Sequence, residues 1–109
     1  MITKFDCAPG CPVQTTLQFI DGKWKSVILY HLSTQTLRFS DLQRKLPYVS
    51  RRMLARQLSE LVTDNVISKE IYETVPIRTE YSLTNFGKTL LPIVNSMVTW
   101  GNKYNELHK

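Results

Sequence analysis

The chain has 109 residues, the size of one ordinary domain, and 42% of them are hydrophobic, which is enough for a buried core. Fourteen basic residues outnumber nine acidic ones, and the formal net charge of +5 favours a polyanionic partner, either nucleic acid or an anionic membrane surface. No apolar run approaches the roughly 20 residues that span a bilayer, and the first residues lack the apolar core of a signal peptide. We therefore expect a cytoplasmic protein that has no membrane partner.

The N-terminal third predicts two helices after a loose arm over residues 1–10. Pro12 suits the first turn of a helix, and Asp21 and Gly22 end that helix. Residues 24–32 predict a second, largely buried helix. The apolar stripe expected on the first helix consists of Val13, Leu17 and Ile20.

The segment 38–56 follows a short extended piece and has a local net charge of +5, as large as the net charge of the whole chain. It contains six basic residues and one acidic residue. Ser40 and Gln43 have the spacing of a capping box, and Pro47 ends the helix that they would begin. Ser50 is a good N-cap for the next helix. Two short helices joined by a tight turn predict a helix-turn-helix.

The second helix of this unit has two distinct faces. Arg52 and Arg56 lie opposite its apolar stripe, and Arg51 lies beside them in the first turn. Basic charge on the exposed face of such a helix is typical of DNA binding, although a solvated face that keeps a small domain soluble is the alternative. The residues predicted to form the buried stripe are Leu54, Leu58 and Leu61.

Two strands are predicted after the helix-turn-helix. Residues 66–72 and 79–83 alternate apolar and polar side chains, as half-buried strands do. The segment between them contains Pro76 and predicts a turn. A two-stranded hairpin directly after a recognition helix makes a winged helix-turn-helix.

Residues 85–107 predict a long C-terminal helix that begins after Thr84 and is kinked or broken near Leu91 by Pro92. Its apolar side chains cover a wider face than a helix on one small domain needs, which favours pairing with the same helix of a second copy. Alternatively, one end of the helix folds back onto Trp24 and its neighbours. The residues expected at the dimer interface are Leu90, Ile93, Val94, Met97, Trp100 and Tyr104.

Several short motifs occur together in one order and spacing. They are CPV (11–13), DGKW (21–24), RFSDL (38–42), SRRML (50–54), QLSEL (57–61) and EYSLTxxG (80–87). In this combination the chain resembles the HxlR-type winged-helix transcription regulators over nearly its whole length. The resemblance implies a homodimer that binds operator DNA near promoters, and in many members a response to electrophiles or oxidants through the cysteine of the CPV motif.

The resemblance also assigns residues. The sensing cysteine corresponds to Cys11, the recognition helix to positions 50–57, and the wing arginine to Arg78. The chain departs from the usual pattern at Arg51 and Arg56, where many members have acidic or neutral polar residues, and Cys7 is an addition. The residues expected to contact DNA are Arg38, Ser40, Arg44, Lys45, Ser50, Arg51, Arg52, Arg56, Gln57 and Arg78.

The position of Cys11 itself suggests reactivity. It directly precedes Pro12, and the partial positive charge of a helix N-terminus lowers the pKa of a thiol placed there. Cys7 could resolve an oxidised Cys11 or pair with a cysteine of a second subunit. Alternatively, Cys11 is a small packing residue, as cysteine often is.

No enzyme signature is present. The four glycines form no phosphate-binding loop, and the two cysteines with His31 and His108 lack the compact spacing of a metal site, so we expect no cofactor. The sequence thus predicts a mainly α-helical protein with a small β-wing, one winged helix-turn-helix domain over residues 1–109 that dimerises through residues 85–107. Its expected function is that of a homodimeric, DNA-binding repressor with a small oxidant or electrophile as inducer. The alternatives are a winged-helix module for protein contacts and a small thiol-disulfide protein.

Overall fold

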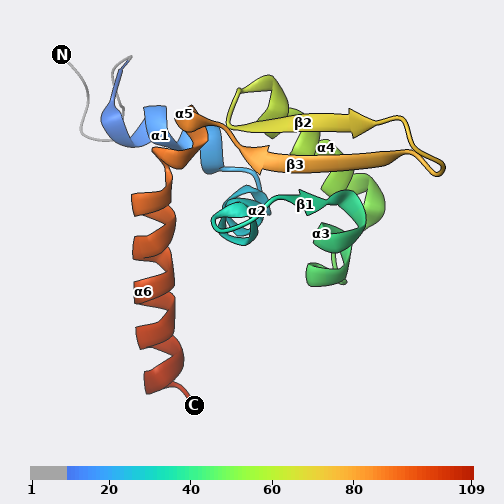
Figure 1. Cartoon of the computed structure of the whole chain (residues 1–109). Helices are drawn as coiled ribbons and strands as arrows, with labels where there is room; N and C mark the ends of the chain where they lie inside the picture. Colours follow the sequence, from blue (N-terminus) through green and yellow to red (C-terminus); the bar gives the residue numbers. More distant parts are fainter. Residues whose placement is uncertain (1–9) are drawn as a thin grey trace.

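A computed structural model describes residues 10–109, and within this range the chain forms six helices and a three-stranded antiparallel sheet (Figure 1). The elements in chain order are α1 (Pro12–Ile20), α2 (Lys25–Leu32), β1 (Leu37–Arg38), α3 (Phe39–Lys45), α4 (Arg51–Thr63), β2 (Ile67–Tyr72), β3 (Arg78–Leu83), α5 (Asn85–Lys88) and α6 (Leu91–Leu107). The prediction of a mainly helical protein with a small β-wing is confirmed.

The sheet has the strand order β1-β3-β2. The hairpin of β2 and β3 pairs Ile67 with Leu83 at its base and Tyr72 with Arg78 at its far end. β1 adds two residues on the other edge of β3, where Leu37 pairs with Tyr81. The two predicted strands are confirmed to within one residue, and the short extended piece becomes β1.

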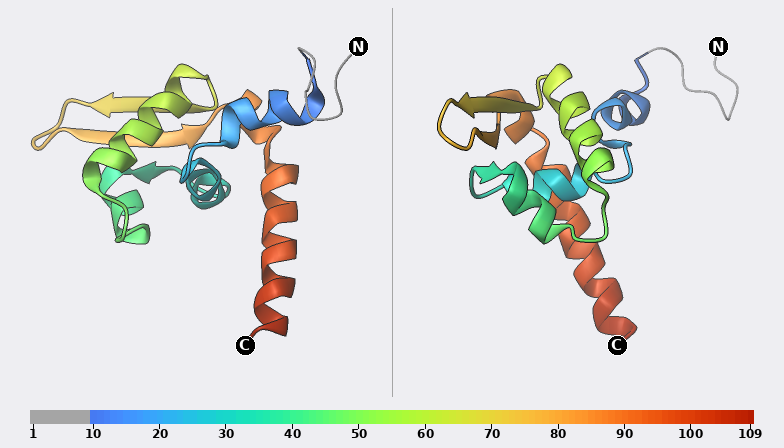
Figure 2. Two further views of the ribbon diagram at one scale, coloured as in Figure 1. Left: turned by 180° about the vertical axis from the view of Figure 1, so that it is seen from behind. Right: turned by 90° about the vertical axis from the view of Figure 1, so that its right-hand side faces the viewer.

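The hydrophobic core lies between the sheet, α2 and α4. Its largest fully buried side chains are Ile28, Leu29, Leu42, Leu46, Leu54, Leu58, Leu61, Val66, Ile67 and Val94. Most of these come from the apolar positions expected to face inwards. The helix-turn-helix and the wing are therefore held on one common core, and α4 packs against β2 (Figure 2).

The long C-terminal helix is divided into α5 and α6, which confirms the break predicted near Leu91. Thr84 begins α5 as predicted, because its Oγ1 accepts a hydrogen bond of 2.9 Å from the Gly87 amide. The break falls at Thr89 and Leu90, and Pro92 occupies the first turn of α6, where a missing N–H removes no helical hydrogen bond. The two views of Figure 2 show α6 projecting away from the body of the molecule.

Candidate nucleic-acid interface

Helix α4 begins where the sequence predicts. The Met53 amide donates a hydrogen bond of 3.0 Å to Ser50 Oγ, so Ser50 is the N-cap. The expected leucine stripe of α4 is fully buried. Burial of that stripe fixes the rotation of the helix and directs Arg52 and Arg56 to solvent, with Arg51 also exposed.

The turn before α4 is held by Gln43. Its Nε2 donates hydrogen bonds to the carbonyl oxygens of Val49 at 2.7 Å and Leu46 at 3.3 Å. These contacts tie α3 to the turn that leads into α4. The last turn of α3 also places Arg44 and Lys45 on the surface, and Arg44 forms an ion pair with Asp41.

The predicted capping box of Ser40 and Gln43 is wrong. Helix α3 begins two residues earlier, with Arg38 in place of Ser40 as the N-cap, because β1 pairs with β3 through Arg38 and the chain enters the helix at Phe39. The Arg38 amide donates to Asp41 Oδ2 at 3.1 Å, which gives Asp41 the role expected of Gln43. Ser40 remains exposed.

Gln57 does not belong to the exposed face of α4. Only 6% of the residue is exposed, so the expectation that it reaches DNA bases is wrong. It lies three residues after Leu54 and four before Leu61, at the edge of the buried stripe, and this spacing could have revealed its burial. A Cβ on Gly22 would lie only 2.3 Å from Gln57 Oε1 and would clash with it. Helix α4 therefore packs closely against the turn between α1 and α2 at this point.

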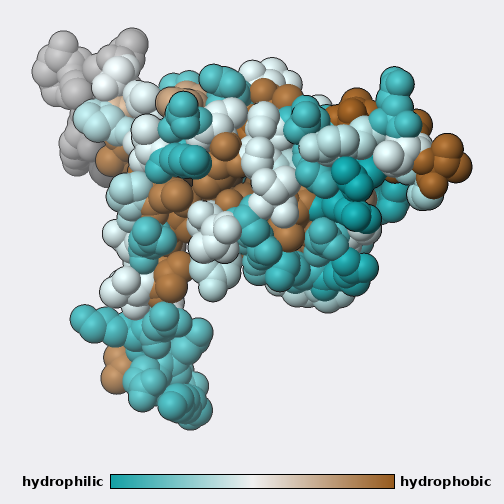
Figure 3. Space-filling view, in the orientation of Figure 1, coloured by the Kyte–Doolittle hydropathy of each residue, from teal (hydrophilic) through white to brown (hydrophobic). Residues whose placement is uncertain are grey.

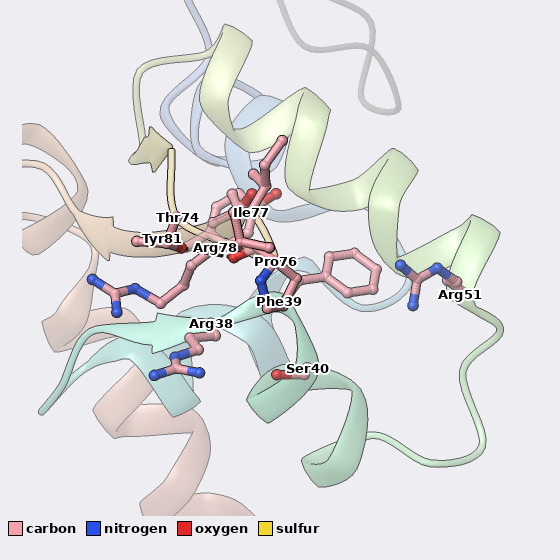
Figure 4. Close-up of a pocket in the computed structure, with 11 residues that line it drawn as sticks. Arg38, Phe39, Ser40, Arg51, Thr74, Pro76, Ile77, Arg78 and Tyr81 are labelled. Atoms are coloured by element: carbon pink, nitrogen blue, oxygen red, sulfur yellow. Dashed lines mark hydrogen bonds between the residues drawn. The ribbon is translucent and has the colours of Figure 1, made fainter. Parts of the chain in front are cut away.

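A groove of about 570 Å³ separates the start of α3 and α4 from the tip of the wing (Figure 4). Arg38, Arg51 and Arg78 line it, together with Phe39 and the exposed Ser40. In Figure 4 the Phe39 ring lies between Arg51 on one side and Arg38 and Arg78 on the other. Three guanidinium groups therefore border a groove between the wing and the start of α3 and α4.

Arg78 is held in place on the wing. Its Nε lies 3.1 Å from Glu80 Oε2, and its guanidinium lies 4.3 Å from the centre of the Tyr72 ring. The wing tip beyond it is apolar, with Val75 fully exposed and Ile77 70% exposed. This exposed apolar tip was not predicted from the sequence, which indicated only a turn at this position.

Cys11 is the N-cap residue of α1, as its place before Pro12 predicts, and it is half-buried. Its carbonyl oxygen accepts a hydrogen bond of 2.8 Å from the Thr15 amide, the first intrahelical bond. Cys7 lies outside the described residues. The helix that Cys11 begins buries Ile20 but leaves Val13 and Leu17 exposed, so the expected stripe of α1 is only partly covered within one protomer.

Helix α6 exposes part of its apolar face, which is visible as hydrophobic surface in Figure 3. Met97 is 44% exposed and Trp100 is 68% exposed, and the Trp100 ring stacks on Tyr104. Leu90 and Val94, which were expected at a dimer interface, are instead buried in the core of the protomer, and Ile93 packs against that core. The exposed face is therefore shorter than the sequence predicts.

Two charged groups that join α2 to α4 were not singled out from the sequence. Lys25 on α2 is buried, and it forms an ion pair with Glu60 on α4. The DGKW motif contains Gly22 but not Lys25, and only the packing of α2 under α4 reveals the pair.

Within residues 10–109, no cluster of three or more histidine, cysteine or acidic residues could hold a metal ion. No helix in the same range is long and apolar enough to cross a membrane.

A family model described as HxlR-like helix-turn-helix matches residues 19–109. The chain belongs to this HxlR-like helix-turn-helix family. Regulators of this class are not enzymes, and the resemblance found in the sequence is confirmed. The HTH-type transcriptional regulator YdeP of Bacillus subtilis is 50% identical over 97 residues, which cover 89% of this chain and 76% of YdeP. YybR of the same organism is 45% identical over 98 residues, covering 90% of this chain and 78% of YybR.

Solved structures agree with the HxlR-like assignment. The redox regulator HypR in its oxidised form is 46% identical to this chain with a TM-score of 0.81, covering 85% of this chain and 96% of HypR. In its reduced form HypR is 44% identical to this chain with a TM-score of 0.83, covering 88% of this chain and 95% of HypR. This chain is accordingly a helix-turn-helix transcriptional regulator.

Proposed function

We propose that this HxlR-like regulator is a homodimeric repressor that reads operator DNA with α4 and responds to oxidants or electrophiles at Cys11. The observation that carries the proposal is the exposed face of α4, where Arg51, Arg52 and Arg56 stand beside the arginine-lined groove of the wing.

In this proposal α4 enters the major groove. Arg52 and Arg56 pair with base edges, since arginine is well matched to guanine. The surrounding residues contact phosphates and fix the register of the protein on the duplex. Arg78 on the wing contacts the DNA backbone or reaches into the minor groove. The proposed phosphate contacts are Arg38, Ser40, Arg44, Lys45, Ser50 and Arg51.

Two copies would pair through the exposed face of α6. Met97, Trp100 and Tyr104 form an apolar stripe that a monomer leaves in water. A two-fold dimer would present two α4 helices to half-sites about 34–36 Å apart, or a multiple of that spacing. A dimer bound over a promoter would exclude RNA polymerase, which makes repression the simplest outcome.

The proposed switch starts at α1. In the reduced protein, the field of the helix N-terminus favours the thiolate of Cys11. An electrophile such as an activated alkene forms an S–C bond with that thiolate while its C=C π bond opens, and the resulting carbanion takes a proton from water. An oxidant such as diamide takes two electrons and two protons from two thiols, which join as a disulfide, and becomes a hydrazine. The second thiol is Cys7 or a cysteine of the other copy. The similarity to HypR, a redox regulator, supports this role.

Footprinting tests the proposal. The reduced protein, freed of reductant, is added to DNA from upstream of its own gene, with and without diamide. We expect a protected segment that is lost after diamide, and a Cys11→Ser variant that protects the same segment under both conditions. Cys7→Ser identifies the second thiol: this variant should ignore diamide if Cys7 is that thiol, and it should respond like the wild type if Cys11 pairs with Cys11 of the other copy. No salt-dependent protection by the reduced wild type would contradict DNA binding and favour a protein-interaction module. Protection that ignores diamide would leave a DNA-binding regulator with a different signal.

A further inference from the structure

A buried positive charge lies under the recognition helix. The side chain of Lys25 is only 6% exposed, although lysine is rarely buried without a partner. Its Nζ lies 2.8 Å from Glu60 Oε1, and this ion pair joins α2 to α4. Gly22, in the turn before α2, leaves the space that the Lys25 stem occupies, since a Cβ on Gly22 would lie 2.8 Å from Lys25 Cδ.

The same carboxylate also holds Arg56. Arg56 Nε donates to Glu60 Oε2 at 3.4 Å, one helical turn along α4. The two oxygens of Glu60 are thus divided between a buried lysine and an exposed arginine whose side chain is 72% exposed. Lys25 already fixes the Glu60 side chain, so pairing with Arg56 costs the conformational entropy of Arg56 but little more from Glu60.

From this geometry we propose that Glu60 is a positioning residue for Arg56, anchored by Lys25, and that it sets the base preference of α4. The inference rests on the proposed role of Arg56 in reading DNA. Glu60 holds the Arg56 guanidinium in one orientation along the helix before DNA arrives. Without it, Arg56 is free to pair with any nearby phosphate, which raises affinity for all sequences and lowers discrimination.

The charges around Glu60 agree with this role. The pKa of the Glu60 carboxyl lies below its usual value, mainly because Lys25 donates a hydrogen bond and supplies a positive charge, with Arg56 adding a smaller effect. A carboxylate near DNA would repel phosphates, but the buried Lys25 offsets that charge locally. Glu60 can therefore stay ionised at the edge of the DNA face.

A binding panel tests the role of Glu60. Glu60→Gln keeps the shape of the side chain and removes its charge. Affinities are measured by fluorescence anisotropy for the operator and for duplexes with single base changes. We define the affinity ratio as the affinity for the operator divided by the affinity for a duplex with one base change. Glu60→Gln should lower this ratio by about fivefold, the low end of what one arginine–base pair provides. Glu106→Gln, which breaks an exposed ion pair with Lys109 at the end of α6, is the matched control and should keep the ratio.

The same panel in an Arg56→Ala background separates positioning from a general charge effect. There, Glu60→Gln should change the ratio by less than about twofold, since its partner is gone. Equal effects in both backgrounds, or an unchanged ratio for Glu60→Gln alone, would overturn the positioning role only. An Arg56→Ala protein that binds the operator with unchanged preference would overturn the proposed reading role as well.

A measurement without DNA completes the test. In the wild type, the Arg56 Nε–H resonance should show slowed solvent exchange by NMR. Both Glu60→Gln and Lys25→Met, which keeps an apolar side chain of similar length in the buried site, should speed that exchange while the protein stays folded. Unchanged exchange in both variants would overturn the proposal.

Discussion

The guanidinium carbon of Arg51 lies 4.8 Å from the centre of the Phe39 ring. Arg51 is the first residue of α4 and Phe39 is the first residue of α3, so this contact joins the starts of both helices of the helix-turn-helix. Because both residues also line the groove beside the wing, the contact holds Arg51 at the edge of the proposed DNA surface.

A double-mutant cycle measures this contact. Phe39→Leu keeps apolar bulk and removes the ring, and Arg51→Ala removes the cation. Urea unfolding of both single variants and the double variant should give a coupling energy of about 0.5–1 kcal/mol, as expected for an exposed cation–π pair. Strictly additive effects would show that the two side chains do not support each other.

Ser50 allows helix stability to be separated from DNA binding. Ser50→Ala removes the acceptor for the Met53 amide and should destabilise the protein by about 1 kcal/mol in urea unfolding. Ser50→Asp restores a capping acceptor and should recover most of that stability. Its negative charge should nevertheless weaken binding to all DNA sequences. An aspartate variant that binds DNA as the wild type does would argue against phosphates lying near the start of α4.

His31 should make stability depend on pH. Its pKa is lowered, first because the ring is partly buried and secondly because Lys45 is nearby. The unfolded chain therefore binds the His31 proton more readily than the folded one, so the free energy of unfolding should fall as pH drops below the ordinary histidine pKa of about 6.5. Urea unfolding between about pH 5.5 and 8 should show this slope in the wild type, a smaller slope in Lys45→Ala, and loss of the His31 contribution in His31→Gln. An identical pH dependence in wild type and His31→Gln would contradict the assignment.

Much of the DNA-binding unit could be predicted from local signals. Ser50 as a cap, the leucine stripe of α4 and the alternating strands each depend on neighbouring residues alone. The start of α3 could not be predicted this way, because pairing of Arg38 in the sheet decides where that helix begins. The burial of Lys25 and the position of Leu90 and Val94 depend equally on which distant elements pack together. For Gln57 the helical spacing held the signal, but its polar side chain suggested exposure.

The exposed face of α6 predicts assembly. Met97→Glu would place an unpaired charge in the proposed interface, which should raise the dimer dissociation constant by at least about 100-fold. Asn102→Glu, on the opposite side of α6, adds the same charge and should leave the dimer intact. Sedimentation equilibrium of the three proteins distinguishes the cases. A wild type that is monomeric at micromolar concentration, or a Met97→Glu protein that remains fully dimeric, would exclude this interface.

The central claim is that α4 reads DNA through its exposed arginines, and equilibrium binding to the footprinted operator and to a scrambled duplex over a range of salt concentrations tests it most directly. Arg52→Ala and Arg56→Ala should each weaken operator binding by about 1–3 kcal/mol and relax base preference. Lys45→Ala should weaken both duplexes alike and reduce the salt slope by about one unit. If both arginine variants bind the operator with wild-type affinity and preference, α4 is not the reading helix.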